Sequence, residues 1–323
     1  MSGDFMKIQN YTPSSYSSDD SEEFVYVFGH KNPDSDSICS ALVVADWLNH
    51  CGCRASAFRL GKLNSETNYI LGRAGINAPE LLDTSLTDKS VWLVDFTDAE
   101  QGPDSLAESN IIGIIDHHRL GTLTTKTVPD IWVRAVGCCA TVIHSILLNE
   151  SNMTLTQPQA ILLMGAIMSD TVALSGPTTT LHDRNAVEHL RRIAGVDYHT
   201  FVDELLAAKT SLDGGSAADL FQRDAKQYLI KNKVLLVSQI ELRQMSDIDP
   251  HLPALLRELK TFVTNSVDVA VLILTDITNK YSVIYSSDSQ LTGNNTPTEL
   301  PGMTSRKKEI LPWLTEHLSS VER

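Results

Sequence analysis

The sequence lacks the features of a membrane protein and of a secreted, disulfide-bonded protein. Its longest apolar runs, such as 267–277, are interrupted by Asp268 and Asp276 and are too short to cross a bilayer. Residues 1–23 contain no apolar core of the kind that a signal peptide needs, and we expect them to form a disordered arm. The five cysteines are odd in number and lack the paired spacing of a zinc ribbon, so we expect reduced thiols in a cytoplasmic protein.

Positive charge is also scarce. The chain has 26 Lys and Arg against 40 Asp and Glu, a net charge of -14. This balance argues against nucleic acid or an anionic membrane as the main partner. It does not exclude a small anionic substrate, because bound divalent ions can invert the local sign of the charge.

The stretch 29–40, Gly-His-Lys-Asn-Pro-Asp-Ser-Asp-Ser-Ile-Cys-Ser, lies where a strand should end and a helix should begin. The β-forming run 24–28 predicts the strand, and Pro33 excludes helix before it. We expect Ser37 to cap the helix that follows.

The same stretch carries three side chains that can bind a metal ion. Asp34 and Asp36 repel each other unless a cation lies between them. His30 adds a nitrogen ligand that manganese, cobalt or zinc accepts readily. The stretch therefore predicts a metal site.

Two further strands end in acidic or histidine residues. A strand at 91–94 is followed by Asp95, and a strand at 111–115 is followed by Asp116, His117 and His118. A short strand at 55–60 completes the predicted parallel sheet. Because the carboxyl ends of parallel strands meet at one edge of a sheet, these side chains should lie near His30.

Apolar helices are predicted at 140–148, 158–168 and 183–193. Asp170 follows the second helix, where an unpaired charge beside apolar residues would be costly. A metal would offset that cost, or the carboxylate caps the next turn; both readings are open.

Six side chains are therefore candidate metal ligands: His30, Asp34, Asp36, Asp95, His117 and Asp170. This carboxylate-rich set exceeds the needs of one tetrahedral zinc and suits two ions that share a bridging carboxylate. Two-metal sites activate water and stabilise phosphoryl displacement. We expect metal-assisted hydrolysis of a phosphate ester or anhydride.

The glycine pair within 211–216 indicates a flexible linker between a catalytic domain at 24–210 and a smaller domain at 217–323. The second domain should contain strands at 234–240, 267–275 and 282–285, a helix at 252–262, a loop at 287–302 and a closing helix. Arg306, Lys307 and Lys308 follow that loop and could bind phosphate oxygens. Taken alone, they fit a solvated helix start better than a phosphate site.

Seven motifs run in one order through the chain: the stretch 29–41, then Leu-Val-Asp at 93–95, Ile-Asp-His-His-Arg at 115–119, Val-Gly-Cys at 136–138, Ile-Met-Ser-Asp at 167–170, Asp-Ala-Lys at 224–226 and Ser-Arg-Lys-Lys at 305–308. Together they resemble the family II inorganic pyrophosphatases of the DHH phosphoesterase superfamily, over residues 24–320. The resemblance implies a larger N-terminal parallel-sheet α/β domain and a smaller C-terminal mixed-sheet α/β domain, with the active site in the cleft between them. It implies hydrolysis of pyrophosphate to two phosphates by a hydroxide that bridges two metal ions.

The resemblance also implies roles for individual residues. His30, Asp34 and Asp95 resemble the ligands of one metal, and Asp36, Asp95, His117 and Asp170 those of the other, with Asp95 bridging. His118, Lys226, Arg306 and Lys307 resemble the phosphate-binding residues, and Asp116 and Gln101 resemble residues that orient the ligands. Asp95, Asp116 and His118 are the implied catalytic residues. The implied ions are two Mn²⁺ or Co²⁺, with Mg²⁺ accompanying the substrate.

The sequence departs from the family pattern after Asp95. Many relatives continue with His-Asn-Glu, whereas this chain has Phe96, Thr97 and Asp98, which leaves its metal preference open. The resemblance suggests a homodimer formed through the N-terminal domain.

Two alternatives to pyrophosphate hydrolysis remain. One is a related phosphoesterase that acts on polyphosphate or small nucleotides, although the Gly-Gly-His motif of the nucleotide-cleaving relatives is absent. The other is a non-catalytic interaction scaffold, which the intact set of candidate ligands disfavours.

Overall fold

The computed structural model describes residues 24–212, 215–264, 266–292 and 297–318. They form two compact units, one made of residues up to Ser175 together with Thr179–Leu205, the other of Gly176–Thr178 together with the residues from Leu206 onward. The predicted disordered arm at 1–23 and part of the predicted linker at 211–216 lie outside the described residues. The predicted domain limits stay a prediction.

The first unit contains a six-stranded parallel sheet with the order β3-β2-β1-β4-β5-β6. Its strands are β1 (Phe24–Phe28), β2 (Arg54–Arg59), β3 (Glu80–Leu81), β4 (Ser90–Val94), β5 (Asn110–Asp116) and β6 (Asp130–Val133). The four strands predicted from the sequence are confirmed. The pattern did not predict β3 and β6, which are short edge strands with little buried surface to mark them.

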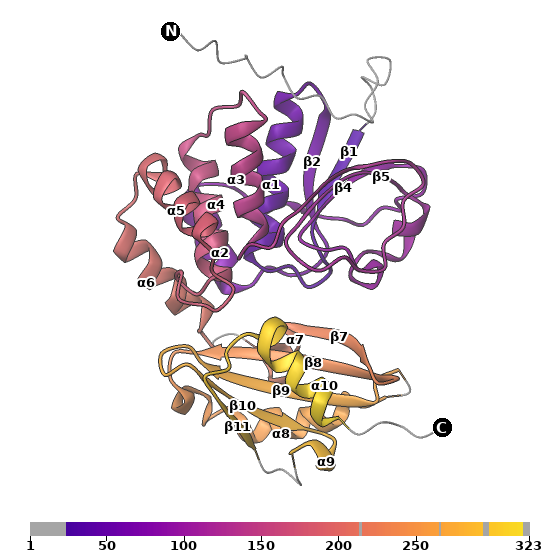
Figure 1. Ribbon diagram of the computed structural model, residues 1–323, viewed down its shortest axis with the longest axis vertical. Coiled ribbons are helices and arrows are strands. Elements are labelled where there is room, and N and C mark those ends of the chain that lie inside the picture. Colours follow the sequence, from indigo (N-terminus) through magenta and orange to yellow (C-terminus); the bar gives the residue numbers. More distant parts are fainter. Residues whose placement is uncertain (1–23, 213–214, 265, 293–296, 319–323) are drawn as a thin grey trace. The chain divides into compact units, whose positions relative to one another are not determined.

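Helices cover one face of this sheet, as Figure 1 shows for α1 to α5. They are α1 (Ser35–His50), α2 (Ser65–Ala74), α3 (Cys139–Asn149), α4 (Gln157–Asp170), α5 (Leu181–Ala194) and α6 (Tyr198–Lys209). At the centre of their core, Trp47 of α1 meets Trp92 of β4 edge to face, with ring centroids 5.7 Å apart. The helix predicted after the stretch 29–40 is α1, and those predicted at 140–148, 158–168 and 183–193 are α3, α4 and α5. Thr156 is the N-cap of α4 and forms a capping box with Gln159.

The other face of the sheet is covered by connecting segments rather than by long helices. Phe28, Leu93 and Ile114 form an apolar layer there with Phe96 and Leu106. Two short 3₁₀ turns, η1 (Ala99–Gln101) and η2 (Asp104–Glu108), lie in these segments. The sheet is therefore buried on both faces, which explains the continuous apolar runs of its central strands.

The prediction that Ser37 caps α1 is wrong. Asp34 is the N-cap, and its carboxylate accepts a hydrogen bond from the backbone N of Ser37 at 3.0 Å. Aspartate and serine are comparable N-cap residues, and Pro33, which excludes helix before it, lies directly before Asp34. The helix therefore begins after Asp34 rather than after Ser37. The side chain of Ser37 is thereby left for another contact.

The second unit contains a five-stranded mixed sheet with the order β11-β10-β9-β8-β7, in which only the β8–β9 pair is parallel. Its strands are β7 (Ala225–Ile230), β8 (Lys233–Leu242), β9 (Val269–Asp276), β10 (Tyr281–Ser286) and β11 (Thr298–Pro301). Its helices are α7 (Ala217–Gln222), α8 (Leu252–Thr261), α9 (Ser289–Thr292), the π-helical η4 (Arg306–Ile310) and α10 (Leu311–His317), with the 3₁₀ turn η3 (Met245–Ile248).

Both faces of the central strand β9 are covered, and all eight of its residues are buried. One core lies between the sheet and η4 with α10, and the other lies between the sheet and α7 with α8. The predicted strands and the helix at 252–262 are confirmed. The prediction of a loop throughout 287–302 is wrong, because this segment contains α9 and the edge strand β11.

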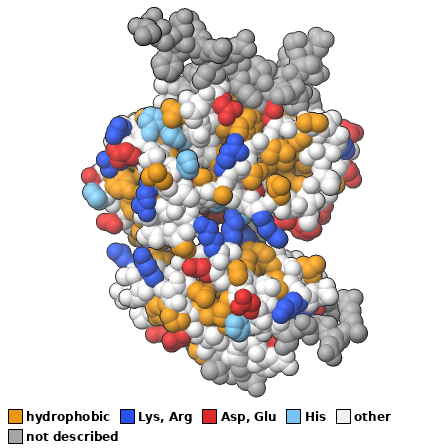
Figure 2. Space-filling view, viewed as in Figure 1, with side chains coloured by type: hydrophobic (Ala, Val, Ile, Leu, Met, Phe, Trp, Pro, Cys, Tyr) orange, Lys and Arg blue, Asp and Glu red, His pale blue; other side chains and the backbone are white. Residues whose placement is uncertain are grey.

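On the face shown in Figure 2, acidic, basic and apolar side chains are interspersed. Among the residues that the structure describes, no helix combines the length and the apolar character that crossing a membrane requires. All five cysteines lie in the described residues and are free thiols, four of them buried. The reduced state of these thiols in the cell stays a prediction.

Candidate metal centre

The register of the parallel sheet brings the candidate ligands together. Phe28 of β1 pairs with Leu93 of β4, and Val94 of β4 pairs with Ile115 of β5. The three strands therefore end side by side, and the residues that follow them share one edge of the sheet. This is the arrangement expected from the sequence.

A glycine allows α1 to begin directly against the end of β1. A Cβ atom on Gly29 would lie 2.5 Å from the Cβ of Ser37, a separation that real side chains do not tolerate. The close approach places Asp34 at the N-cap and Asp36 in the first turn, both facing the sheet edge. His30 follows the glycine and is 2% exposed.

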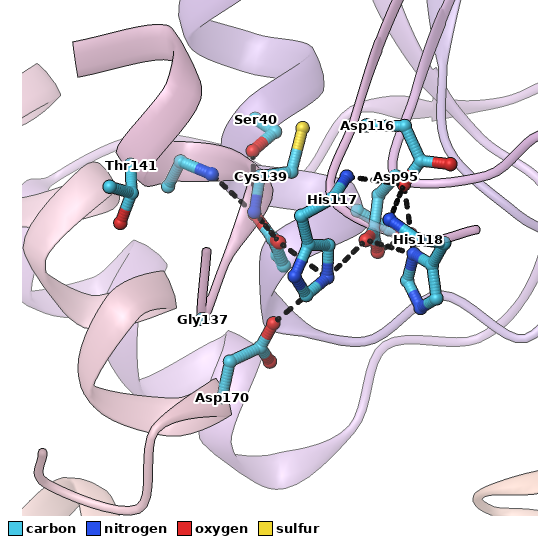
Figure 3. Close-up of polar contacts among 12 residues, drawn as sticks. Ser40, Asp95, Asp116, His117, His118, Gly137, Cys139, Thr141 and Asp170 are labelled. Atoms are coloured by element: carbon cyan, nitrogen blue, oxygen red, sulfur yellow. Dashed lines mark hydrogen bonds and ion pairs between the residues drawn. The ribbon is translucent and has the colours of Figure 1, made fainter. Parts of the chain in front are cut away.

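Two groups of donor atoms meet at the carboxylate of Asp95. In the first group, His30 Nε2 lies 3.4 Å from Asp34 Oδ2 and 3.3 Å from Asp95 Oδ2. In the second group, His117 Nε2 lies 3.3 Å from Asp95 Oδ1, 3.9 Å from Asp36 Oδ2 and 3.8 Å from Asp170 Oδ2. Figure 3 shows the His117 ring between the carboxylates of Asp95 and Asp170.

These separations fit the coordination of metal ions. Two donors about 2.1 Å from an octahedral ion and at right angles to each other lie about 3 Å apart. The two oxygens of Asp95 face different groups, as they would in a carboxylate that bridges two ions. All six predicted ligands therefore belong to one continuous donor set, and this set fits two divalent metal ions.

The backbone of Asp95 is held in an uncommon conformation. Its φ angle is +67°, in the left-handed region, which aspartate tolerates better than most residues. Its N–H donates to the carbonyl of Ile115 at 2.9 Å, so the ladder between β4 and β5 continues through this residue. The strand therefore fixes where the carboxylate lies.

Ser37 anchors the Asp95 carboxylate, a role that the sequence did not reveal. Its Oγ donates to Asp95 Oδ2 at 3.0 Å, and both residues are buried. The signal that could have found it is the spacing Asp34-x-x-Ser37, which is typical of an aspartate N-cap and leaves the serine hydroxyl free for other acceptors.

Asp36 is held by two helices. Ser40, one turn along α1, donates to its Oδ1 at 2.7 Å, and the backbone N of Ala140 in the first turn of α3 donates to the same oxygen at 3.0 Å. The backbone N of Cys139 donates to Oδ2. The N-terminus of a helix favours a negative charge, so α3 fixes this carboxylate and stabilises its ionised form.

Burial shifts the pKa values of carboxylates in this donor set. Burial, followed by the negative charge of Asp95, raises the pKa of Asp36 to about 6. Burial alone would also raise the pKa of Asp95, but hydrogen bonds from His117 and His30 lower it well below its usual value. Bound cations would relieve the repulsion between these carboxylates.

Asp116 lies behind the donor groups and orients His118. Its Oδ1 accepts from the backbone N of His117 at 2.7 Å, from the backbone N of His118 at 3.0 Å and from His118 Nδ1 at 2.8 Å. Burial and the charge of His117 lower the pKa of His118 to about 4. His118 is therefore a neutral imidazole near pH 7, with Nδ1–H directed at Asp116 and a lone pair on Nε2.

The other predicted site residues lie outside this donor set. Lys226 is on β7 and Arg306 and Lys307 begin η4, so all three belong to the second unit. Gln101 contacts the His30 segment through its backbone carbonyl, which accepts from the N of Lys31 at 2.8 Å. Phe96, at the departure from the family pattern, is buried against Phe28 with ring centroids 6.4 Å apart.

One further potential ligand was not predicted. The Sγ of Cys138, the N-cap of α3, groups with carboxylate oxygens of Asp36 and Asp170, all within 4.8 Å of one another. Burial and the charge of Asp36 raise the pKa of this thiol well above its ordinary value. The geometry thus places a protonated sulfur beside the second donor group.

Comparison with known proteins agrees with the geometry. The DHH family N-terminal domain matches residues 24–167, and the DHHA2 domain matches residues 203–317. A protein of Staphylococcus saprophyticus named "probable manganese-dependent inorganic pyrophosphatase" is 34% identical over 307 residues, which cover 91% of this chain and 98% of that protein. One of the same name from Clostridium acetobutylicum is 32% identical over 304 residues, with the same coverage.

Solved structures give the same result. A crystal structure titled as a family II inorganic pyrophosphatase of Methanococcus jannaschii matches with a TM-score of 0.82 and 32% identity, over 91% of this chain and 99% of that one. An exopolyphosphatase-related protein of Bacteroides fragilis matches with a TM-score of 0.50 and 13% identity, over 91% and 92%, and shares only the fold. With both domain models matched in order and relatives above 30% identity along nearly the whole chain, this protein belongs to the family II, manganese-dependent inorganic pyrophosphatases of the DHH superfamily.

Proposed function

We propose that this protein hydrolyses inorganic pyrophosphate to two phosphates in a metal-dependent reaction. The observation that carries the proposal is the buried carboxylate of Asp95, whose two oxygens each lie 3.3 Å from the histidine of a different donor group. Similarity to relatives named as manganese-dependent pyrophosphatases supports both the substrate and the metal.

The first unit would hold two Mn²⁺ or Co²⁺ ions, with Mg²⁺ entering with the substrate. His30, Asp34 and Asp95 would hold one ion, and Asp36, Asp95, His117 and Asp170 would hold the other. When bound, the ions supply Lewis acidity that acidifies water and neutralises phosphate charge. The protein's contribution is to fix the donors, through Ser37 on Asp95 and through Ser40 and α3 on Asp36.

We propose that His118 accepts and donates a proton during the reaction. Its neutral ring directs Nδ1–H at Asp116, so Nε2 can accept a proton. The negative charge of a bound pyrophosphate would favour the imidazolium form, as the Asp116 carboxylate already does. His118 would then donate a hydrogen bond to a phosphate oxygen, or a proton to the leaving phosphate.

Lys226, Arg306 and Lys307 are proposed to supply positive charge for the substrate phosphates. Guanidinium groups bind phosphate oxygens through two parallel N–H donors, and ammonium groups act as point charges. The location of the active site in a cleft between the domains stays a prediction.

We also propose a homodimer formed through the first unit. β6 is an edge strand of its sheet, and Ile131 on this strand is 51% exposed. The neighbouring Val128 is 88% exposed.

The free thiols support a reducing compartment, and we propose the cytoplasm.

The experiment that tests the proposed function is phosphate release from pyrophosphate, tripolyphosphate and a dinucleotide. The protein is first stripped of metal by chelation and then supplied with Mn²⁺, Co²⁺ or Mg²⁺. We expect turnover of pyrophosphate to exceed that of the other two substrates and to depend on added metal. Equal or faster turnover of tripolyphosphate or the dinucleotide would favour the alternative phosphoesterase, and no turnover of any substrate would favour the scaffold.

A further inference from the structure

The guanidinium of Arg306 is held by one residue of the segment that precedes β7. Its Nη2 lies 2.8 Å from Asp224 Oδ1, and its Nη1 donates to the backbone carbonyl of Asp224 at 2.6 Å. Nη1 also contacts the carbonyl of Val237 at 3.4 Å. The Arg306 side chain is 10% exposed, whereas that of Asp224 is 42% exposed. Asp224 therefore meets a largely buried arginine from the solvent side.

These contacts use a particular edge of the guanidinium. An arginine has five N–H donors: two on Nη1, two on Nη2 and one on Nε. Among the described residues, both donors of Nη1 and one of Nη2 have partners, namely Asp224 and Val237. The remaining two, on Nε and Nη2, are parallel and lie on the same edge, the geometry that binds a phosphate or carboxylate through two hydrogen bonds.

The backbone before Arg306 is also fixed by polar contacts. Gln239 on β8 donates to the carbonyl of Thr304 at 3.0 Å, and Ser282 on β10 donates to the carbonyl of Met303 at 2.8 Å. Glu309 accepts from the backbone N of Ser305 at 2.9 Å. With its backbone fixed on one side and its Nη1 edge on the other, Arg306 loses little conformational freedom when it binds a ligand.

We propose that Asp224 is a positioning residue, which holds Arg306 so that its Nε edge is presented to a phosphate group of the substrate. The inference rests on the proposed function and adds to it a residue for which the sequence suggested no role. The carboxylate acts through the arginine and touches no substrate itself. If Asp224 acted mainly by neutralising the charge of Arg306, its removal would strengthen phosphate binding, so the sign of the mutational effect distinguishes the two roles.

The test is a double-mutant cycle on the full-length protein with D224A, R306A and D224A/R306A. Asp288→Asn is the matched control, since Asp288 forms an ion pair of 3.4 Å with Lys233 in the same unit. We expect D224A to raise the KM for pyrophosphate at least about tenfold, the scale of a lost hydrogen bond to a charged group. In the R306A background the same change should alter KM less than about twofold. Asp224→Glu should restore part of the lost affinity, and D288N should resemble wild type.

An unchanged or lower KM in D224A would overturn the inference, and so would equal effects of D224A in the two backgrounds, which would indicate a structural role. Binding of inorganic phosphate, measured by calorimetry on wild type and D224A, gives the same comparison without turnover. A wild-type protein that fails to hydrolyse pyrophosphate contradicts the proposed function. Phosphate binding that does not weaken in D224A contradicts only the role of Asp224.

Discussion

The two units meet the same problem, that of clustered like charges, in opposite ways. In the first unit, the carboxylates of Asp36 and Asp95 are buried and held by hydrogen bonds from Ser37, Ser40 and the N-terminus of α3. In the second, Lys307 is exposed at the start of η4, and Arg306 is held by an ion pair with Asp224. The first unit fixes its candidate metal donors by hydrogen bonds from rigid elements, whereas the second carries its candidate phosphate-binding cations on long side chains.

This difference teaches where precision is needed. A metal ion accepts ligands only within narrow limits of distance and angle, so its donors must be placed by rigid backbone such as strand ends and helix starts. A phosphate group can be reached by long side chains whose charge matters more than their exact place. Mutations of the candidate metal ligands should therefore abolish activity, and mutations of the candidate phosphate-binding cations should weaken it in a graded way.

The largest effect is expected from Asp95→Asn. The amide keeps the size of the side chain but removes the charge between His30 and His117, and with it one bridging oxygen. Metal-dependent phosphate release should fall below about 1% of wild type, the scale of losing a main electrostatic contact. Circular dichroism should show an unchanged fold, and Asp104→Asn, at an exposed carboxylate, is the control. Retention of more than a few per cent of activity would contradict the bridging role.

The next effect is expected from Ser37→Ala, which removes the hydroxyl that donates to Asp95. Loss of such a supporting contact typically costs 10- to 100-fold in metal affinity, so we expect about tenfold or more. Titration with Mn²⁺ followed by electron paramagnetic resonance measures this affinity. Ser35→Ala is the matched control, because Ser35 is buried in the same helix but contacts Thr67. Equal affinity in wild type and Ser37→Ala would show that the donors need no such support.

Arg306→Ala should weaken substrate binding by the second unit. We expect the KM for pyrophosphate to rise about 10- to 100-fold, the cost of a lost charged hydrogen bond, with Mn²⁺ affinity unchanged. Steady-state kinetics and the same Mn²⁺ titration measure the two quantities. Lys233→Ala, which removes a cation paired with Asp288 in the same unit, is the control. Weaker Mn²⁺ binding in Arg306→Ala would contradict the division of roles between the units.

The smallest effect concerns a histidine pair of the first unit away from the donor set. His144 on α3 and His189 on α5 lie 2.8 Å apart, and burial, followed by the charge of His189, lowers the pKa of His144 to about 4. Protonation therefore favours the unfolded chain. The stability that His144 contributes should be complete above about pH 6.5 and lost as the pH falls toward 4, by at most about 3 kcal/mol.

Urea unfolding of the metal-free protein between pH 4 and 7 checks this prediction. His144→Gln cannot titrate, so its stability should fall less steeply than that of wild type over this range. Parallel curves for the two proteins would show that the His144 pKa is not lowered by folding.

The sequence predicted most of the fold because its central strands are continuous apolar runs and its helices carry clear start signals, such as Thr156 before α4. It failed where local pattern is weak. The edge strands β3, β6 and β11 bury little surface, so no apolar run marks them. The helix α2 begins in a polar segment and is fixed by the Asn64 cap and by packing of Ile70 and Leu71.

The six candidate ligands were predictable because each one lies near the end of a strand or at the start or end of a helix, and the parallel sheet brings its strand ends together. The hydrogen bonds that hold these ligands in place could not be predicted from the sequence. Ser37 on Asp95 and the N-terminus of α3 on Asp36 join residues 58 and more than 100 positions apart, which depends on packing rather than on local pattern. Asp224 belongs to a motif that the sequence showed, but its role did not emerge for the same reason, since its partner Arg306 is 82 positions away.

The central claim is that the first unit positions two metal ions with Asp95 between them. Electron paramagnetic resonance of the full-length, chelator-treated protein titrated with Mn²⁺ tests this most directly. The account predicts two tightly bound ions per chain, with a spectrum broadened by exchange between ions roughly 3.5–4 Å apart, and loss of that coupling in Asp95→Asn. A single tightly bound ion, or two ions with independent spectra, would contradict it.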